Sequence, residues 1–193
     1  RSIHALHPHF VALAQLGYQE KLPTSEEIRR LGLEAEREML LATNNVNTHK
    51  GALFAMGLVL IAAAHNYYIH GVIQEQSLRT AICRLASDFP APKGTHGAVR
   101  RQYNVGGALA QAAAGYTDLF ADWLPYLRQL KGDTFAAHKT LLYIMTTLDD
   151  TNVLHRKGAQ VASEVKEEAR TLLSNFYEAA LIKLNQRYIK ENI

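Results

Sequence analysis

The sequence predicts an all-α protein, folded as a single compact multi-helix domain around one buried central helix. Apolar residues recur three and four positions apart along most of the chain, and runs that alternate with period two are missing. Residues 52–64 are apolar or small throughout, interrupted only by Gly57. Because a helix that is apolar on all sides is normally buried, we expect the central helix over 51–68.

The helices can be placed in order along the chain. A helix over 25–43 begins with a capping box formed by Thr24 and Glu27. Its apolar face then carries Ile28, Leu31, Ala35 and Met39. After the central helix, further helices are expected over 74–87, 97–114, 118–131 and 134–148. Gly132 is a good stop for the third of these and Asp133 a good N-cap for the fourth.

The last helix is predicted to be long and unbroken to the C-terminus. One apolar stripe runs through Val161, Val165, Ala169, Leu172, Phe176, Ala180 and Leu184. No internal repeat and no low-complexity linker divides the sequence, so residues 1–193 are predicted to form one domain.

Composition excludes several classes of protein. The net charge of +3 comes from basic residues spread among acidic ones, so nucleic acid is not expected as a partner. The apolar run at 51–64 is shorter than the roughly 18 residues that cross a bilayer, and no membrane association is expected. Cys83 is the single cysteine, which rules out an internal disulfide and favours the cytoplasm.

Three polar segments interrupt the helical pattern, each at the end of an expected helix. The first polar segment is Asn44-Asn45-Val46-Asn47-Thr48-His49-Lys50-Gly51. The second contains Thr95-His96-Gly97, Arg100-Arg101, Tyr103 and Gly106-Gly107. The third is Asp149-Asp150-Thr151-Asn152-Val153-Leu154-His155-Arg156-Lys157-Gly158. Polar groups placed at the start of a buried helix lose hydration, which indicates a binding site.

The residue types suggest a site for a metal and phosphates. Asp149 and Asp150 are hard oxygen ligands of the kind that hold Mg²⁺ together with substrate phosphates. The same pair would serve equally well as a plain helix end with solvent-exposed acids. Lys50 stands directly before the central helix, where free N–H groups and the helix dipole favour an anion, and Gly51 lets the backbone approach it.

Other residues fit anion binding and proton transfer. Arg100 and Arg156 can bind phosphate through two parallel hydrogen bonds, although paired arginines on a helix, such as Arg100-Arg101, usually face water. His49 and His96 have the near-neutral intrinsic pKa of a general base. No Gly-x-x-x-x-Gly-Lys-Ser/Thr occurs, so a P-loop is excluded, and no Gly-x-Ser-x-Gly turn is present. The absence of a His-Asp dipeptide counts against a metal phosphohydrolase of the HD type.

In this order and spacing, the three polar segments resemble the triphosphoribosyl-dephospho-CoA synthase family. The resemblance covers nearly the whole chain, and its first and third motifs are specific. It implies an all-helical enzyme that displaces adenine from ATP and joins the triphosphoribosyl group to the 2′-hydroxyl of 3′-dephospho-CoA. The product would be the prosthetic-group precursor of citrate lyase or of malonate decarboxylase.

This chemistry suggests a role for each site residue, because displacing adenine builds positive charge on the ribose and needs a base and a bound triphosphate. The expected catalytic residues are His49, His96 and Asp150. The expected substrate- and phosphate-binding residues are Asn47, Thr48, Lys50, Gly51, Arg100, Asn152 and Arg156. The expected Mg²⁺ ligands are Asp149 and Asp150, and the expected substrates are ATP and 3′-dephospho-CoA.

The chain departs from the family pattern in two ways. The family's upstream Lys-Pro-Gly-Leu-Val-Asp and Gly-Ala-His motifs are not in these residues, so we expect a missing amino-terminal segment to complete the site. An Arg and a Glu of the family pattern are replaced by Leu109 and Gln111. A catalytically impaired nucleotide-binding relative is therefore the alternative function, and a helical assembly subunit is a third. A homo-oligomer is left open.

Overall fold

The computed structural model describes residues 2–47, 49–90, 98 and 101–193. These residues form helices and connecting turns without any strand, which confirms the all-α prediction. The chain folds into two compact units, which are described separately. Unit 1 is residues 1–90 with 108–116, and unit 2 is residues 91–107 with 117–193. The organisation as a single domain stays a prediction.

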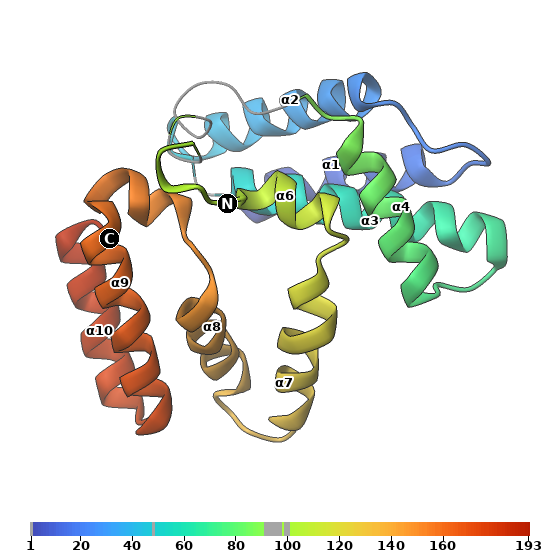
Figure 1. The fold of residues 1–193 in the computed structure, drawn as a ribbon. Coiled ribbons are helices and arrows are strands. Elements are labelled where there is room, and N and C mark those ends of the chain that lie inside the picture. Colours follow the sequence, from blue (N-terminus) through green and yellow to red (C-terminus); the bar gives the residue numbers. More distant parts are fainter. Residues whose placement is uncertain (1, 48, 91–97, 99–100) are drawn as a thin grey trace. The chain divides into compact units, whose positions relative to one another are not determined.

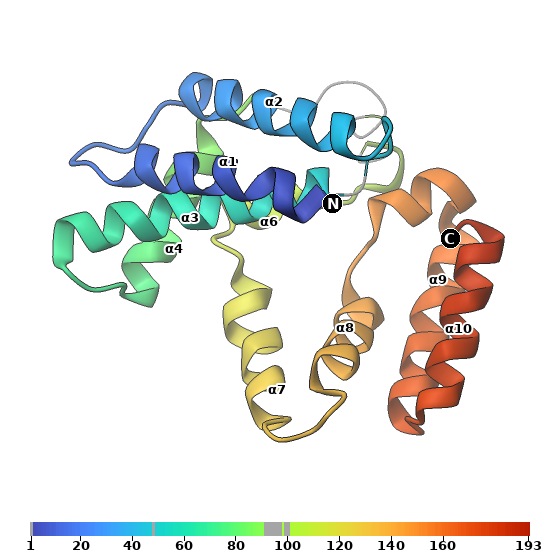
Figure 2. The ribbon, with the colours of Figure 1, turned by 180° about the vertical axis from the view of Figure 1, so that it is seen from behind.

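Unit 1 is built from α1 (Ser2–Gly17), α2 (Ser25–Ala42), α3 (Lys50–His70), α4 (Glu75–Ser87) and most of α6 (Gly107–Ala113). α1 packs against both α2 and α3, and α4 packs against α3 (Figures 1 and 2). The capping box at the start of α2 is confirmed. Thr24 Oγ1 accepts a hydrogen bond from the Glu27 N–H at 3.3 Å, and the Glu27 carboxylate accepts the Thr24 N–H at 2.8 Å.

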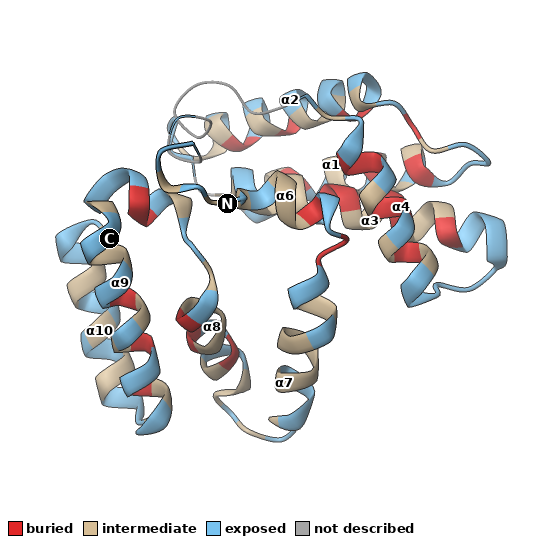
Figure 3. Ribbon diagram, in the orientation of Figure 1, coloured by how far each residue is buried: buried red, intermediate tan, exposed pale blue. Residues whose placement is uncertain are grey.

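α3 is the central helix of unit 1, but the prediction that it is buried on every side is wrong. One face is buried and carries Leu53, Gly57, Leu58, Ile61, Ala62 and Asn66. Met56 is half exposed on another face, and so are Tyr67 and Tyr68 near the end of the helix. The neighbouring helices cover only part of its surface, as the mixture of colours along α3 in Figure 3 shows.

The contact between α1 and α3 is close enough to involve the backbone. A Cβ atom added at Gly17 would lie 2.3 Å from the carbonyl oxygen of Ile61, so only glycine fits at the end of α1. α3 continues to His70, beyond the apolar run counted in the sequence, and among the described helices it alone is long and apolar enough to cross a membrane. The core helix of a soluble protein passes the same test of length and composition.

Unit 2 contains η1 (Leu119–Trp123), a π-helix, followed by α7 (Leu124–Gln129), α8 (Ala136–Thr147), α9 (Thr151–Ser174) and α10 (Glu178–Glu191). α8 packs on α9, and α10 runs back beside α9 (Figures 1 and 2). Leu142, Ala169 and Leu172 form its buried core cluster. Packed against that cluster are Met145, Leu173, Phe176, Ala180, Leu181 and Leu184.

The prediction of one unbroken final helix is wrong. α9 ends at Ser174, and α10 begins at Glu178 after a three-residue turn. The apolar stripe nevertheless continues, because Phe176, Ala180 and Leu184 pack against the cluster from the turn and from α10. The helical spacing is thus satisfied by two helices of a hairpin, which sequence periodicity does not distinguish from one.

Two further boundaries differ from the prediction. Within the described part of 97–114, residues 101–103 are helical, but the helix stops at Asn104, which has a φ of 53°. α6 then starts anew at Gly107, whose φ is 66°. Asp133 does not occupy the N-cap position of α8, which belongs to Phe135, but its Oδ1 accepts the Phe135 N–H at 2.7 Å.

Candidate functional site

The first polar segment forms an exposed connection between α2 and α3. Asn44 and Asn45 both adopt the left-handed conformation, with φ of 53° and 64°, which asparagine tolerates better than most residues. The side chains of Asn44, Asn45 and Asn47 are exposed. The expectation that this segment loses its hydration is therefore wrong, because the chain carries it over the surface of unit 1.

Asn47 caps the start of α3. Its Oδ1 accepts the backbone N–H of Lys50 at 3.1 Å, which satisfies one of the N–H groups left free at a helix start. The backbone N–H of His49 donates to the sulfur of Met39 at 3.2 Å, and His49 itself is the N-cap residue. Gly51 lies exposed in the first turn of α3. Thr48 lies outside the described residues.

Lys50 is paired with a carboxylate that the sequence motifs did not indicate. Its Nζ lies 2.6 Å from Oε1 of Glu36 on α2, and the Lys50 side chain keeps 54% of its exposure. The pair borders a cavity of about 160 Å³, which is otherwise lined mainly by apolar residues of α1, α2 and α3. Because Glu36 lies fourteen positions away on another helix, no local spacing in the sequence signals the pair.

Asp150 is the N-cap residue of α9, at the start of the third polar segment. Its Oδ1 accepts the backbone N–H groups of Asn152 at 2.7 Å and Val153 at 3.3 Å. Its Oδ2 makes no hydrogen bond to any part of the chain that the structure describes, and the residue is exposed. Asp150 therefore caps the helix with one oxygen, and its other oxygen has no partner in the described chain.

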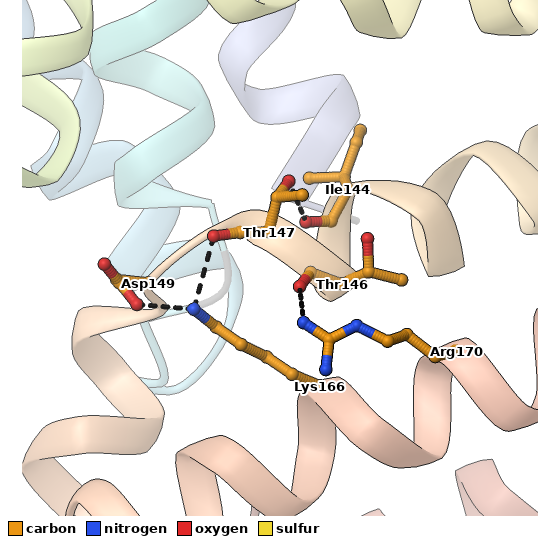
Figure 4. Close-up of polar contacts among 6 residues, drawn as sticks. All are labelled: Ile144, Thr146, Thr147, Asp149, Lys166 and Arg170. Atoms are coloured by element: carbon orange, nitrogen blue, oxygen red, sulfur yellow. Dashed lines mark hydrogen bonds and ion pairs between the residues drawn. The ribbon is translucent and has the colours of Figure 1, made fainter.

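Asp149 is held differently, by an ion pair with Lys166 of α9. Figure 4 shows the Lys166 ammonium between Asp149 Oδ1, at 2.6 Å, and the carbonyl oxygen of Thr147, at 3.2 Å. One turn further along α9, Arg170 donates to the carbonyl of Thr146 at 2.9 Å. The two cations satisfy carbonyl groups at the end of α8, a favourable place for positive charge. Neither was predicted from the sequence, although they stand four positions apart on one helix face.

Gly158, the last residue of the third polar segment, breaks α9. Its φ of 82° and ψ of −179° lie in a region that is essentially restricted to glycine. An added Cβ would lie 3.9 Å from the hydroxyl oxygen of Tyr103, so the structure brings a residue of the second polar segment beside the third. Asn152 and Arg156 are exposed on the helical turns between Asp150 and Gly158. His96 and Arg100 lie outside the described residues.

The predicted site residues are thus divided between the two units. Asn47, His49, Lys50 and Gly51 belong to unit 1, whereas Asp149, Asp150, Asn152 and Arg156 belong to unit 2. Leu109 and Gln111 are partly buried on α6 of unit 1. Because they stand two positions apart on a helix, their side chains do not face each other. The Arg and Glu of the family pattern would therefore not pair directly at these positions.

The third polar segment contains two adjacent exposed carboxylates, Asp149 and Asp150, as candidate metal ligands. Where the structure describes side chains, no group of three or more His, Cys, Asp or Glu residues converges on one point. Asp149 and Asp150 can together supply two carboxylates. This fits a cation such as Mg²⁺, which takes one or two carboxylates and completes its coordination with waters and substrate phosphates. It does not fit a cation that requires a closed cage of protein ligands.

Comparison with known proteins identifies the family. A protein of Azotobacter vinelandii named probable 2-(5''-triphosphoribosyl)-3'-dephosphocoenzyme-A synthase is 38% identical in an alignment that covers 89% of this chain and 62% of that protein. A Pectobacterium atrosepticum protein named 2-(5''-triphosphoribosyl)-3'-dephosphocoenzyme-A synthase is 31% identical, over all of this chain and 69% of its own length. A Klebsiella pneumoniae protein of the same name is 34% identical, over 90% of this chain and 65% of its own.

The chain spans roughly two thirds of the length of these curated relatives. No solved structure matches it. The family model described as ATP:dephospho-CoA triphosphoribosyl transferase matches residues 1–193. Because that match extends over the whole sequence and curated relatives carry the corresponding name, this chain belongs to the ATP:dephospho-CoA triphosphoribosyl transferase family.

Proposed function

We propose that the protein transfers the triphosphoribosyl group of ATP to the 2′-hydroxyl of 3′-dephospho-CoA and releases adenine. The glycosidic bond between the ribose C1′ and adenine breaks, and a bond from C1′ to the acceptor oxygen forms. The hydroxyl proton leaves through a base, and the departing adenine takes up a proton. The family match over the whole chain carries this proposal. The comparisons give no support to the alternative of an impaired nucleotide-binding relative.

We assign the metal-binding role to the junction between α8 and α9. Asp150 is exposed and keeps one oxygen without a described partner, and the preceding residue Asp149 carries a second exposed carboxylate, one oxygen of which is paired with Lys166. Mg²⁺ held there would neutralise charge on the triphosphate. Asn152 and Arg156, exposed on the next turns of α9, would orient the substrate and hold a phosphate.

The first polar segment is assigned to the phosphates and to proton transfer. Lys50 supplies a half-exposed ammonium at the start of α3, where the helix dipole also favours an anion. Asn47 keeps the first turn in place through its hydrogen bond to the Lys50 N–H. Thr48 and Gly51 would add further donors to a phosphate, and Arg100 a second cation. His49 or His96 would accept the hydroxyl proton.

The decisive experiment measures adenine release from ATP in the presence of Mg²⁺ and 3′-dephospho-CoA. Asp150→Asn is the informative variant, because asparagine caps a helix as well as aspartate does and only the charge is lost. We expect adenine release to fall at least a hundredfold while the circular dichroism spectrum is unchanged. Asp88→Asn is the matched control, since Asp88 also accepts a backbone N–H, from Ser25, far from the third segment in sequence.

The outcomes separate the candidate functions. Wild-type protein that binds ATP without releasing adenine would overturn the transferase proposal and favour the impaired relative. Full activity of Asp150→Asn in an active protein would overturn the metal assignment alone.

The phosphate assignment is tested at Lys50. Lys50→Met is expected to raise the KM for ATP more than it lowers kcat. Glu36→Gln is expected to lower that KM, because it removes the carboxylate that competes for the Lys50 ammonium.

The cytoplasm is the proposed location. The lone cysteine of the sequence is a free thiol in the structure, which suits a reducing compartment. The apolar helix α3 packs against α1, α2 and α4, as a core helix does.

A further inference from the structure

A second cavity, lined mainly by polar residues, lies in unit 1 between the last two turns of α3 and the largely exposed side of α4. Its volume is about 370 Å³, within the range of small-ligand sites. Its lining residues are Leu22, His65, Asn66, Ile69, His70, Gln76, Ser77, Thr80, Ala81 and Arg84. None of the sequence motifs falls among them. Seven of these ten residues carry a polar side chain, which is unusual for a groove between two packed helices.

The lining of this α3–α4 cavity contains a positively charged group and no negatively charged one. Its lining includes a guanidinium, two imidazoles, two hydroxyls and two amides, but no aspartate or glutamate. Arg84 is exposed and forms no ion pair with any described residue. The nearby cation Arg79, by contrast, has Glu75 at 4.0 Å. An arginine without a carboxylate partner, among neutral donors, is suited to bind an oxyanion through parallel hydrogen bonds.

Asn66 offers a further donor to the cavity. It is only 3% exposed, and its Oδ1 accepts the backbone N–H of Gln74 at 3.0 Å. Its Nδ2 group makes no hydrogen bond within the described chain and is not one of the buried atoms that lack a partner, so it is open to solvent in the cavity. His65 is fixed in a similar way. Its Nδ1 lies 2.9 Å from the Gln19 carbonyl oxygen, which can only accept, so Nδ1 donates and Nε2 of the neutral ring can accept the hydrogen of a phosphate P–OH group.

The α3–α4 cavity is separate from the site assigned above. His65 and Lys50 are fifteen residues apart on the same helix, which corresponds to about 22 Å along its axis at about 1.5 Å per residue. One phosphate group therefore cannot contact both. We propose that the α3–α4 cavity is a binding site for a phosphate group, held by Arg84, Asn66 and His65. The phosphate is either a free ion or part of a larger metabolite.

The test is a titration of the whole protein with inorganic phosphate, followed by isothermal calorimetry, with chloride at matched ionic strength as the blank. Saturable binding to the wild type is expected. Arg84→Met should weaken it at least tenfold, and Arg84→Lys should weaken it less because the charge remains. Arg37→Met is the matched control, since Arg37 is an exposed arginine of unit 1 outside the cavity, and it should bind phosphate as the wild type does.

A second variant guards against a purely structural effect. Asn66→Asp keeps an oxygen that can accept the Gln74 N–H but replaces the amide donor with an acceptor, so the fold should persist and phosphate binding should disappear. If the wild type shows no saturable binding, or if Arg84→Met and Arg37→Met bind alike, the proposal is overturned.

The same calorimetric experiment can distinguish a free phosphate ion from a phosphate group that belongs to a nucleotide. A titration with 3′-dephospho-CoA that displaces phosphate, and that is weakened by Arg84→Met, identifies a phosphate carried by that nucleotide. Phosphate binding that 3′-dephospho-CoA does not affect identifies the free ion. Both results support the site, and neither depends on transferase activity. A protein that releases no adenine can still bind phosphate here.

Discussion

Gly158 is the residue whose backbone most constrains the third polar segment. Its conformation is close to forbidden for residues with a Cβ atom, yet the nearest atom to an added Cβ is 3.9 Å away. Gly158→Ala therefore meets no steric clash and reports backbone strain alone. We expect it to lower the free energy of unfolding by about 1–3 kcal/mol, measured by urea denaturation.

The matched control for Gly158→Ala is Gly32→Ala. Gly32 lies inside α2, and an added Cβ there meets nothing within 4 Å. Alanine has a higher helix propensity than glycine, so Gly32→Ala should leave the free energy of unfolding unchanged or raise it by up to about 1 kcal/mol. If Gly158→Ala is as stable as Gly32→Ala, the kink in α9 is not required for folding.

Tyr116 is a buried residue with a hydroxyl that has no described hydrogen-bond partner. Burial raises the pKa of this hydroxyl to about 12, so it remains protonated at neutral pH. Because a buried polar group without a partner is destabilising, we expect Tyr116→Phe to raise the free energy of unfolding by about 1 kcal/mol. Tyr188→Phe is the control and should lower the free energy of unfolding, since it removes the hydrogen bond that the Tyr188 hydroxyl donates to Glu168 at 2.8 Å. A loss of stability in both variants would contradict the assignment.

At the scale of the elements, Glu168 links α9 to α10 through Arg187 and Tyr188, beside the apolar contacts between the two helices. The ion pair with Arg187 holds the pKa of Glu168 below its usual range, and the hydroxyl of Tyr188 adds to the effect. A lowered pKa in the folded state means that the unfolded chain binds the proton more tightly. The stabilisation is therefore present above the unfolded pKa of about 4.3 and is lost as the pH falls through the folded value.

The variant that tests this pairing is Glu168→Gln. We expect it to be less stable than the wild type at pH 7, with a difference that shrinks steadily as the pH falls below about 4.3. Denaturant unfolding across the pH range measures both proteins. Glu164→Gln, which removes an exposed glutamate from the same helix, should follow the wild type. A wild-type advantage that persists unchanged to pH 2 would show that Glu168 does not titrate with folding.

The elements also show which parts of the fold a single sequence can predict. The capping box at Thr24 was predictable because both partners lie within four residues of each other. The turn between α9 and α10 was not, because Phe176, Ala180 and Leu184 keep the helical spacing across it and reach the same core. The break at Asn104 was also missed, because asparagine gives only a weak signal for the left-handed conformation.

The sequence motifs indicated candidate site residues, but they did not indicate the ion pairs that these residues form. The residue types and their order indicated Lys50, Asp149 and Asp150. The partner of Lys50 is Glu36 on α2, and the partner of Asp149 is Lys166 on α9, at sequence separations that only the folded chain fixes. The exposure of Asn44, Asn45 and Asn47 was missed for the same reason, since an apolar helix start does not show whether the residues before it are covered.

At the scale of the whole molecule, nucleotide binding should raise thermal stability. A ligand that binds only the folded protein adds about 2.7 kcal/mol when its concentration is a hundred times its dissociation constant. We expect Mg²⁺ and ATP together to raise the melting temperature, and EDTA to remove most of that increase. Differential scanning fluorimetry measures both effects. If the rise in melting temperature is just as large in the presence of EDTA, a metal at Asp149 and Asp150 is contradicted.

The two oxygens of Asp150 give a way to compare members of this family by sequence alone. Asn, Ser or Thr at this position would preserve the helix start, because each can accept the N–H groups that Oδ1 accepts here. Only aspartate also leaves a negatively charged oxygen outside the helix. Selection for folding alone would let these four residues interchange, whereas selection for a charged ligand would keep aspartate. The residues found at this position in diverged relatives therefore record which of the two pressures has acted.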